Sequence, residues 1–436
     1  MRVIVTLTLS LFQICSAQDH WSLEDCIDYA LNNNISLKQS ELNIKSTKNK
    51  QLQSKFQILP SINASSSFNQ NRGRYIDPFS NTFIEDVSSN FNVSTTASLN
   101  IFNGFQNINQ IKKSSNEYLK SIYDLESAKN ELISSIAMSY LQILFNEELY
   151  QTAEKQLALS KSQEERISAL HDAGSIAKGE LLNIQSQIAS EEQILVQNEN
   201  QLTLSKLQLA QLLDIENFDE IQVLKINFDI PKVIIQDNIN DDFLKASNLQ
   251  GSIKSSKLAV KSAEYDLKIA KSNILPSLNI SYRASSLYSD NVVDMFTFNE
   301  QIDNNRQSGI FLSMTIPIFN QWATRNSIAQ NKIQIINSRL QAQQTLNQLR
   351  KNMEQAYTDQ LAAFKRYESA NKTLAARKES FNYASKRHEL GMVNSYDFNE
   401  SKNNLITSES DQLQAKYDLI FKIKLYQFYT SLKFEL

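Results

Sequence analysis

Glycine and proline are scarce in this sequence. Of its 436 residues, 7 are glycine and 5 are proline, whereas ordinary usage of the two together is about 12%. Compact folds with many tight turns need these residues, so the scarcity excludes such folds and favours long uninterrupted elements. Doubly wound nucleotide-binding folds and Gly-rich phosphate loops are disfavoured for the same reason. Beyond residue 59, the longest spans that contain neither residue are 105–173, 180–230, 318–390 and 392–436.

An excess of charge of one sign is also missing. The 44 Lys and Arg residues nearly balance the 47 Asp and Glu residues, which leaves a net charge of −3. No basic block is present that would follow a phosphate backbone, so nucleic acid is disfavoured as a partner. The sequence has 3 histidines, no metal-spaced cluster and no nucleophile motif. We therefore expect neither an enzyme nor a bound cofactor.

The N-terminal segment 1–17 is typical of a secretory signal peptide. Arg2 precedes a largely apolar run over 3–14, and small residues follow it immediately before Gln18. We therefore expect the mature chain to begin at Gln18. Lipidation of Cys15 is disfavoured, because lipidation signals have a small residue just before the cysteine and Ile14 stands there.

Cysteine and long apolar runs are lacking in the predicted mature chain. Cys26 is its only thiol, so no intrachain disulfide is possible, and we expect Cys26 to be a semi-buried apolar residue. No later run reaches the 18 or so apolar residues that a membrane-spanning helix needs. The sequence thus predicts an exported protein without a helical anchor.

Three landmarks of the first half recur in the second half at a nearly constant spacing, and their shared order predicts a tandem duplication. They are Ile58–Asn63 with Ile274–Asn279, Ile101–Asn103 with Ile318–Asn320, and His171–Gly174 with His388–Gly391. The predicted layout is a signal peptide at 1–17, a first repeat at 18–213, an inter-repeat linker at 214–240 that contains Pro231, and a second repeat at 241–436.

Each repeat changes its hydrophobic period twice. Residues 23–57 have a helical pattern, and Pro60 ends this helix as Pro276 does in the second repeat. A period of two then predicts strands with one apolar and one polar face. These strands are expected over 61–70, 90–101, 278–285 and 309–318. The polar segments 71–88 and 289–307 are expected to be exposed loops.

The four predicted strands leave two interpretations open. Strands of about ten residues have the length that crosses a bilayer. Four strands cannot close a barrel, since membrane barrels start at about eight. The apolar face suits a soluble sheet packed on helices equally well at this point.

Coiled-coil helices follow the strands. A seam of apolar residues spaced seven apart predicts a heptad repeat, and it consists of Leu181, Ile188, Leu195, Leu202 and Leu209. The equivalent positions of the second half form a second seam with one polar position, at Phe398, Leu405, Gln412, Leu419 and Tyr426. A helix over 105–170 would be about 100 Å long. Rods of this length pack on one another, and they form a channel where they surround a space.

Taken together, these landmarks resemble the outer-membrane efflux protein family, the TolC-like channels, over essentially the whole mature chain. The matching segments are Trp21–Asn34, the two Leu-Pro-Ser helix-to-strand junctions at Pro60 and Pro276, Leu99–Gly104, and the turn glycines Gly174 and Gly391. The resemblance implies a mainly α fold with a small β-barrel portion: a long coiled-coil α-barrel plus four transmembrane strands per chain, joined in a trimeric 12-stranded barrel. Two chains would give a barrel filled by side chains, whereas three leave an open lumen.

The resemblance also implies a location and partners. A homotrimer would sit in the outer-membrane lipid of a Gram-negative bacterium, with a long periplasmic extension. It would serve as an exit duct for efflux of small molecules or for type I protein secretion. A periplasmic adaptor and an inner-membrane RND, ABC or MFS-type pump would work with it, and transport energy would come from the pump.

Inward-facing acids constrict the periplasmic entrance in this family, just after the second hairpin turn. Aligned on Gly391, these acids resemble Asp397 and Glu400, which are spaced i, i+3 on one helix face. Three chains would bring six carboxylates together, which raises some of their pKa values and attracts cations. The alternative is a solvated pair of acids near a helix N-terminus. The first-repeat equivalents are Glu180 and Asn183, one acid rather than two.

His388 and Glu180 complete the predicted constriction, and the turns at Gly174 and Gly391 are the predicted tips for adaptor contact. His388 and His171 are expected to be exposed turn residues rather than a pH-sensing gate.

The sequence departs from the family pattern at the inner turn. The tyrosine and arginine that latch this turn in the family align with His388 and Val393. Either Arg387 replaces the latch or the latch is absent.

A function of a different class remains open. A periplasmic coiled-coil scaffold or adaptor protein would also have long helices, but it leaves four alternating strands of bilayer length unexplained. The cargo, whether drug, metal ion or polypeptide, does not follow from these residues, and neither does the identity of the pump and adaptor.

Overall fold

The structure, a computed structural model, describes residues 20–76, 81–218, 221–226, 239–290, 295–432 and 434. The predicted signal peptide at 1–17, including Cys15, lies outside the described residues, and so does Pro231 of the predicted linker.

The described chain folds into two compact units, and each unit draws on both halves of the sequence. The helical unit comprises Met1–Ser40, Leu125–Gly251 and Leu346–Leu436, and the sheet unit comprises Glu41–Asp124 and Ser252–Thr345. In each half the element order is helix, helix, strand, strand, helix, helix, with a short helix inserted between the strands of the second half. The repeat boundaries themselves stay a prediction.

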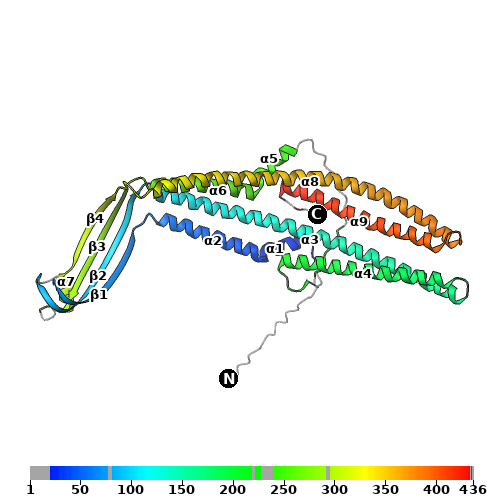
Figure 1. Ribbon diagram of the computed structural model, residues 1–436, viewed down its shortest axis with the longest axis horizontal. Helices are drawn as coiled ribbons and strands as arrows, with labels where there is room; N and C mark the ends of the chain where they lie inside the picture. Colours follow the sequence, from blue (N-terminus) through cyan, green and yellow to red (C-terminus); the bar gives the residue numbers. More distant parts are fainter. Residues whose placement is uncertain are drawn as a thin grey trace, which may run out of the picture. The chain divides into compact units, whose positions relative to one another are not determined.

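The sheet unit contains one antiparallel sheet (Figure 1), in the order β1-β2-β3-β4. Its strands are β1 (Ser61–Ile76), β2 (Phe83–Asn103), β3 (Ser277–Ser289) and β4 (Gln307–Thr315). Each strand pairs with its neighbour in the order, and β2 pairs with β3 across the two halves of the chain. The four expected strands are thereby confirmed.

The register gives this sheet one apolar face. Phe91 lies opposite Phe68 on one side and Tyr288 on the other, and side chains alternate along a strand. The same face, called the apolar face below, also carries Ile62, Ala64, Val93, Ala97, Leu99, Leu278, Ile280, Tyr282, Ile310, Leu312 and Met314. Serine and asparagine dominate the other face. The apolar face is largely exposed in the single chain, as Ile62 (70%), Phe68 (66%) and Ile310 (72%) illustrate.

Hydroxyl groups join the helices of the sheet unit. The unit contains the C-terminal part of α2 (Ile35–Phe56), the N-terminal parts of α3 (Gln106–Asp172) and α8 (Ala323–Glu389), and nearly all of α6 (Gly251–Ser272). Between α2 and α3, Thr47 bonds Ser121 at 2.8 Å and Ser54 bonds Ser114 at 2.6 Å. Between α3 and α6, Lys113 Nζ lies 2.7 Å from an Asp266 carboxylate oxygen. Small polar residues therefore let these helices approach closely.

The helix-to-strand junctions of the two halves meet in the sheet unit. Gly104, directly after β2, has a φ of +64°. A Cβ atom there would lie 2.5 Å from the backbone oxygen of Ser272, the last residue of α6. Glycine is therefore required at this turn both by backbone conformation and by the close approach of α6.

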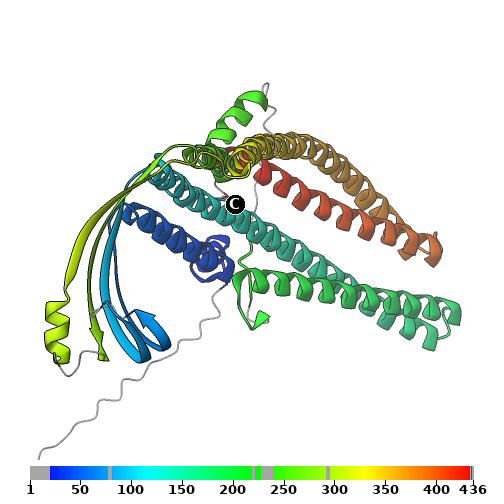
Figure 2. The same cartoon turned by 60° about the vertical axis from the view of Figure 1, so that its left-hand side comes forward.

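The helical unit has an apolar core between helices of both halves. It contains α1 (Leu23–Asn33), α4 (Lys178–Leu213), α5 (Ile239–Leu249) and α9 (Ser395–Ser431) with parts of α3 and α8 (Figure 2). Tyr140 of α3 donates from its hydroxyl to the carbonyls of Trp21, at 3.0 Å, and Leu224, at 2.8 Å. This core fixes the N-terminal segment and the start of the predicted linker on α3, and its buried residues include Leu23, Cys26, Ala30, Ile136, Ile143, Leu209, Leu213 and Ile420.

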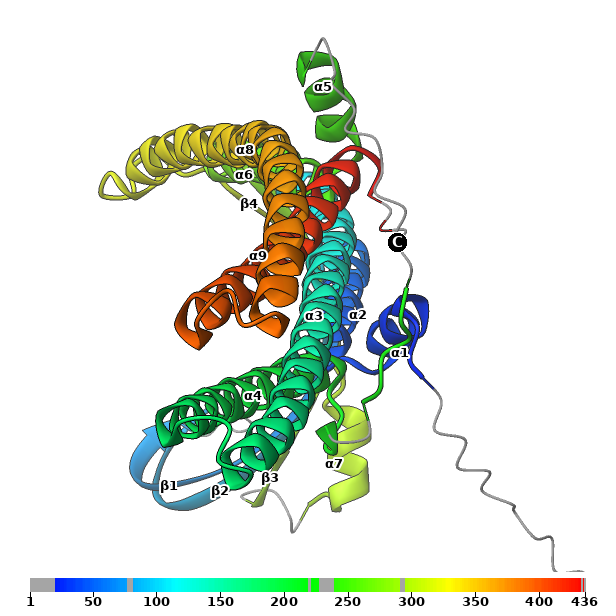
Figure 3. The ribbon, with the colours of Figure 1, turned by 90° about the vertical axis from the view of Figure 1, so that its right-hand side faces the viewer.

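Two helical hairpins extend from this core, α3 with α4 and α8 with α9 (Figure 3). Leu157, Ile184 and Ile188 join the first pair of helices, and Ala363, Leu419 and Ile423 join the second. The coiled-coil helices expected from the heptads are thus confirmed.

Three expectations about the strands and the segments between them are wrong. Residues 71–88 are not one loop, because β1 continues to Ile76 and β2 begins at Phe83; polar side chains suit a strand whose faces are both exposed. Residues 289–307 contain α7 (Phe298–Asn304), which begins with a capping box between Thr297 and Glu300. The strand expected to reach 318 ends at Thr315.

The helix expected over 23–57 is divided at Asn34. The side-chain oxygen of Asn34 accepts from the backbone N–H groups of Ser36 and Leu37, at 3.0 and 3.2 Å. This cap starts α2 where α1 has ended.

Cys26 provides a test of the helical core. Its side chain is 0% exposed, and burial raises the pKa of its thiol to about 12. Because the thiolate is the reactive form, a disulfide reagent such as Ellman's should leave Cys26 unmodified in the folded mature protein and modify it fully in guanidinium. A Ser36→Cys variant, whose new thiol is exposed, should react in both states. Rapid reaction of Cys26 in the folded protein would contradict the core.

Candidate functional site at the helical hairpins

The two hairpin turns share one backbone arrangement. Gly174 and Gly391 both have a left-handed backbone, with φ of +71° and +70°. At the first turn, the N–H groups of Gly174 and Ser175 donate to the carbonyls of His171 and Leu170, at 2.8 and 2.9 Å. The second turn repeats these two bonds at the equivalent positions, at 3.0 and 2.8 Å. Glycine ends both helices because only glycine adopts this conformation without strain.

The helices that leave the turns begin differently. At the start of α9, the side chain of Asn394 accepts from the backbone N–H of Asp397 at 2.8 Å. At the start of α4, Ala177 occupies the same position and provides no side-chain cap. Asp397 is thus held in the first turn of α9, where its carboxylate also favours the helix dipole.

A pocket of about 420 Å³ lies between the ends of the two hairpins. Glu180 of α4 and His388 of α8 both line it, together with Gly391. The His388 ring stacks on Phe398 of α9, with 4.6 Å between ring centroids and an angle of 22° between planes. His388 is therefore half-buried against an aromatic ring, rather than exposed as expected.

The predicted acids of α9 lie apart from this pocket. Phe398 and Asn399 line the pocket, but Asp397 and Glu400 do not, and both acids are exposed. The structure therefore brings Glu180 and His388 together and leaves Asp397 and Glu400 on another face of α9. Val393, at the position of the family's latch residue, lines the pocket with an apolar side chain. Whether Arg387 replaces the latch stays a prediction.

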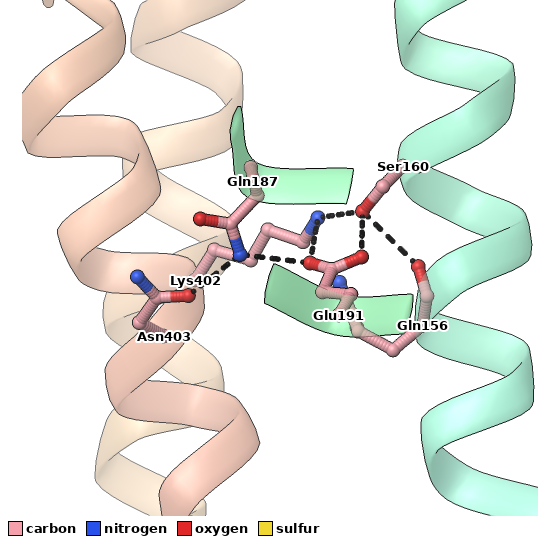
Figure 4. A network of polar contacts seen from close by, with 6 residues as sticks. All are labelled: Gln156, Ser160, Gln187, Glu191, Lys402 and Asn403. Atoms are coloured by element: carbon pink, nitrogen blue, oxygen red, sulfur yellow. Dashed lines mark hydrogen bonds and ion pairs between the residues drawn. The ribbon is translucent and has the colours of Figure 1, made fainter. Parts of the chain in front are cut away.

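A buried polar network, called the hairpin network below, joins the two hairpins about one to two helical turns from the residues that line the pocket. It consists of Ser160 on α3, Glu191 on α4 and Lys402 on α9 (Figure 4), which are 0%, 4% and 1% exposed. The Lys402 ammonium donates to the Ser160 hydroxyl at 2.6 Å and to Glu191 Oε1 at 3.3 Å. The Ser160 hydroxyl donates to the other carboxylate oxygen of Glu191.

A glutamine extends the hairpin network to a second contact with α9. Gln187 Nε2 donates to Glu191 Oε1 at 2.8 Å and to Asn403 Oδ1 at 3.1 Å. Consecutive residues of α9, Lys402 and Asn403, are thereby bonded to two residues one turn apart on α4. The contact fixes the register of α9 along α4.

Burial and the neighbouring carboxylate change the pKa of Lys402 in opposite directions. Loss of solvent around its ammonium lowers its pKa, and the adjacent Glu191 carboxylate partly opposes that change. Removing two charges from water costs several kcal/mol per ion, roughly, so such a pair stabilises a fold only when its bonds are complete. Here the carboxylate oxygens of Glu191 accept bonds from all three neighbours.

Sequence reasoning did not identify the hairpin network. A signal was present, because Glu191 follows Ile188 by three positions, as Leu212 follows Leu209 in the same seam. The equivalent positions hold Ile184, Asn198, Ser205 and Leu212, so they are partly polar, and a charged residue that is buried at one of them needs a partner. The partner, Lys402, lies on a helix in the other half of the chain, and no sequence spacing indicates it.

The profile of the family described as outer membrane efflux protein matches residues 26–214 and 245–422. The chain belongs to the outer membrane efflux protein family. This assignment confirms the resemblance stated for the sequence and the expected location in the outer membrane. It also places the chain in a family of channels rather than of enzymes.

A curated relative and several solved structures agree with the family. The outer membrane efflux protein BepC of Brucella suis is 25% identical over 169 residues, which are 38% of this chain and 35% of BepC, so the match spans about a third of that relative's length. The solved structure of CusC is similar, with a TM-score of 0.81 and 16% sequence identity over 94% of this chain and 91% of CusC. The structure of VceC of Vibrio cholerae has a TM-score of 0.80 and 15% sequence identity over 94% of this chain and 95% of VceC. CmeC of Campylobacter jejuni has a TM-score of 0.80 at 18% identity over 94% of this chain and 85% of CmeC.

These structures show the fold of this outer membrane efflux protein. The predicted class, mainly helical with a small antiparallel sheet in the TolC-like arrangement, is confirmed. Within the described residues no helix is long and apolar enough to span a membrane. The same residues contain no group of three or more His, Cys, Asp or Glu side chains placed to hold a metal ion.

The hairpin network predicts that removing the buried charge of Lys402 destabilises the protein more than removing the exposed charge of Lys372. Lys402→Met leaves the buried Glu191 without its cation and should lower the free energy of unfolding by about 3–5 kcal/mol. Lys372→Met removes an exposed ion pair with Glu368, 3.1 Å apart, and should cost under about 1 kcal/mol. Denaturant unfolding followed by far-UV circular dichroism measures both variants.

A combined variant separates the loss of a partner from the loss of packing. Lys402→Met with Glu191→Leu leaves no unpaired charge, so it should be more stable than Lys402→Met alone. If Lys402→Met and Lys372→Met destabilise the protein equally, the buried ion pair does not hold the hairpins together.

Proposed function

We propose that three copies of this chain form an outer-membrane exit duct for efflux. The observation that carries the proposal is a sheet with an exposed apolar face and two edges that the described chain does not pair. Membership of the outer membrane efflux protein family supports it. The energy for transport comes from a partner, because a duct has no means of coupling to a fuel.

Aromatic residues border the apolar face at both ends. Phe68, Phe91 and Tyr288 lie at the outer end of the face, opposite one another. At the inner end, Phe102 lies near the end of β2 and Phe105 follows the strand. Their rings make an edge contact with 5.2 Å between centroids, and Trp322, just before α8, is 60% exposed. An apolar band between two aromatic girdles is the pattern of strands in an outer membrane. It supports a bilayer around this face and water at the serine-rich face.

The two sheet edges support closure by further copies. Within the described residues β1 pairs only with β2, and β4 pairs only with β3. A bilayer supplies no hydrogen-bonding partner for the free backbone groups of an edge. Pairing β4 of one copy with β1 of the next removes the free edges along the length of β4 when the ring closes, and three copies give twelve strands with an open lumen.

The hairpin turns support a periplasmic entrance controlled by acids. Asp397 and Glu400 are exposed on the face of α9 that does not line the pocket, so they are free to face the lumen. Around a threefold axis they form a ring of carboxylates, and Glu180 and His388 lie at the pocket behind it. The tips at Gly174 and Gly391 are the surfaces for a periplasmic adaptor, which joins the duct to an RND, ABC or MFS-type pump for small molecules or secreted polypeptides.

Planar-bilayer recording tests the duct directly. In fractionated cells, the mature protein should be found in the outer membrane. The purified protein should run as a trimer and produce step increases of conductance in a lipid bilayer. A protein that stays in the soluble periplasmic fraction and gives no conductance would overturn the proposal.

The proposed gate predicts a block by divalent cations. Conductance should fall when a divalent salt is added on the side of the hairpin turns, because closely spaced carboxylates bind cations. Asp397→Ala with Glu400→Ala should relieve the block, whereas Glu41→Ala with Glu131→Ala, which removes two exposed acids of α2 and α3, should leave it intact. An unchanged block in the first variant would remove Asp397 and Glu400 from the gate.

A further inference from the structure

β3 extends beyond the end of β4. Gln307, the first residue of β4, lies opposite Ser285, and β3 continues to Ser289. The segment 286–289 of β3 therefore has no β4 partner. A free edge of this kind needs a covering element.

The short helix α7 covers this free edge of β3. The Asn305 side-chain amide donates to the Leu287 carbonyl at 2.7 Å, and the Ser289 N–H donates to Gln301 Oε1 at 2.9 Å. The Ser286 hydroxyl donates to the carbonyl of Ile302 at 2.6 Å. The side-chain amides of Gln301 in α7 and of Asn305 just after it thus bond the backbone groups of β3 that have no β4 partner.

Aromatic contacts hold α7 against the apolar face. The Phe298 ring lies 5.0 Å from the Tyr288 ring and 6.2 Å from the Phe91 ring, measured between centroids. Gln301 is 2% exposed, and its amide also donates to the carbonyl of Phe296 at 3.1 Å. The orientation of α7 is therefore fixed, with its acidic side chains, Glu300 and Asp303, exposed.

Strand lengths leave a matching free edge on the neighbouring copy. β1 has 16 residues and β4 has 9. When β4 pairs antiparallel with the β1 of the next copy from their helix junctions, Thr315 against Ser61, the segment 70–76 of that β1 has no β4 partner. Beyond the end of β4 the adjacent element of the first copy is α7.

Charges on the two elements are complementary. β1 contains Arg72 and Arg74 and no acidic residue. α7 contains Glu300 and Asp303 and no basic residue. Asp303 lies 2.6 Å from Arg306 and is still 67% exposed, so it remains accessible to a second cation. Arg72 and Asp303 are the most direct pair, because Arg74 lies over the Phe83 ring at 5.0 Å and Glu300 takes part in the capping box.

We propose that α7 binds the outer end of β1 in the neighbouring copy, with Asp303 facing Arg72, and so completes the subunit seam where β4 is too short. This contact rests on the proposed trimer. The helix acts as an interaction surface for a second copy of this chain, and it seals the seam above the aromatic border of the apolar face.

Charge reversal tests the contact. Asp303→Arg and Arg72→Asp should each lower, by several degrees, the temperature at which the detergent-solubilised trimer dissociates on electrophoresis. The two changes combined should restore most of that loss, because the pair is re-formed with opposite polarity. Glu41→Lys and Lys48→Glu, which reverse exposed charges of α2, should leave the temperature unchanged alone and together.

Two outcomes would overturn the inference while leaving the duct in place. In one, the trimer forms and conducts, and neither reversal changes its dissociation temperature. In the other, each reversal weakens the trimer but the combination brings no recovery, which indicates damage to α7 or to the hairpin of β1 and β2. A wild-type chain that forms no trimer contradicts the proposed function itself.

Discussion

The free edges of one four-stranded sheet impose the main constraint on this protein. Among the described residues the outer sides of β1 and β4 have no strand partner, and the apolar face between them is open to its surroundings. Water would be a poor surrounding for such a face, and lipid would be a poor surrounding for such edges. A bilayer around the face and further copies at the edges meet both demands together. The polar face then encloses water, which is what a duct requires.

Polar groups also determine how the helices pack. In the sheet unit, serine and threonine pairs join α2 to α3 at separations of 2.6 to 2.8 Å. In the helical unit, the hairpin network joins α9 to α3 and α4 through a buried ion pair. Apolar seams tolerate sliding of one helix along another, whereas hydrogen bonds are satisfied only in one register. The hairpins that bear the proposed gate are therefore held at defined positions along each other.

Much of this fold could be predicted from the sequence, because its signals are local and repeated. Pro60 and Gly391 interrupt long periodic segments, and such interruptions mark element boundaries directly. The capping box at Thr297 and Glu300 was equally local, yet α7 was missed because its seven residues are too few to show a helical period. The outer parts of β1 and β2 were missed because charged residues, Arg72 and Arg74 in β1 and Glu85 and Asp86 in β2, interrupt the alternation of apolar and polar side chains.

The candidate site could be predicted only in part. The position of Asp397 and Glu400 came from the family resemblance and the turn at Gly391, and their role as a gate still rests on that basis. The pair of Glu191 and Lys402 depends on which helices become neighbours after folding, and that information is not contained in the spacing of either residue.

Closure of the sheet by copies of the same chain is the central claim, and disulfide trapping across the β1 and β4 edges tests it most directly. One cysteine at Ser65 would be combined in turn with one at each position of β4, and the oxidised protein separated without reductant. The account predicts linked dimers and trimers at one register, with no larger species. No linked species at any register, or a ladder that continues beyond the trimer, would contradict it.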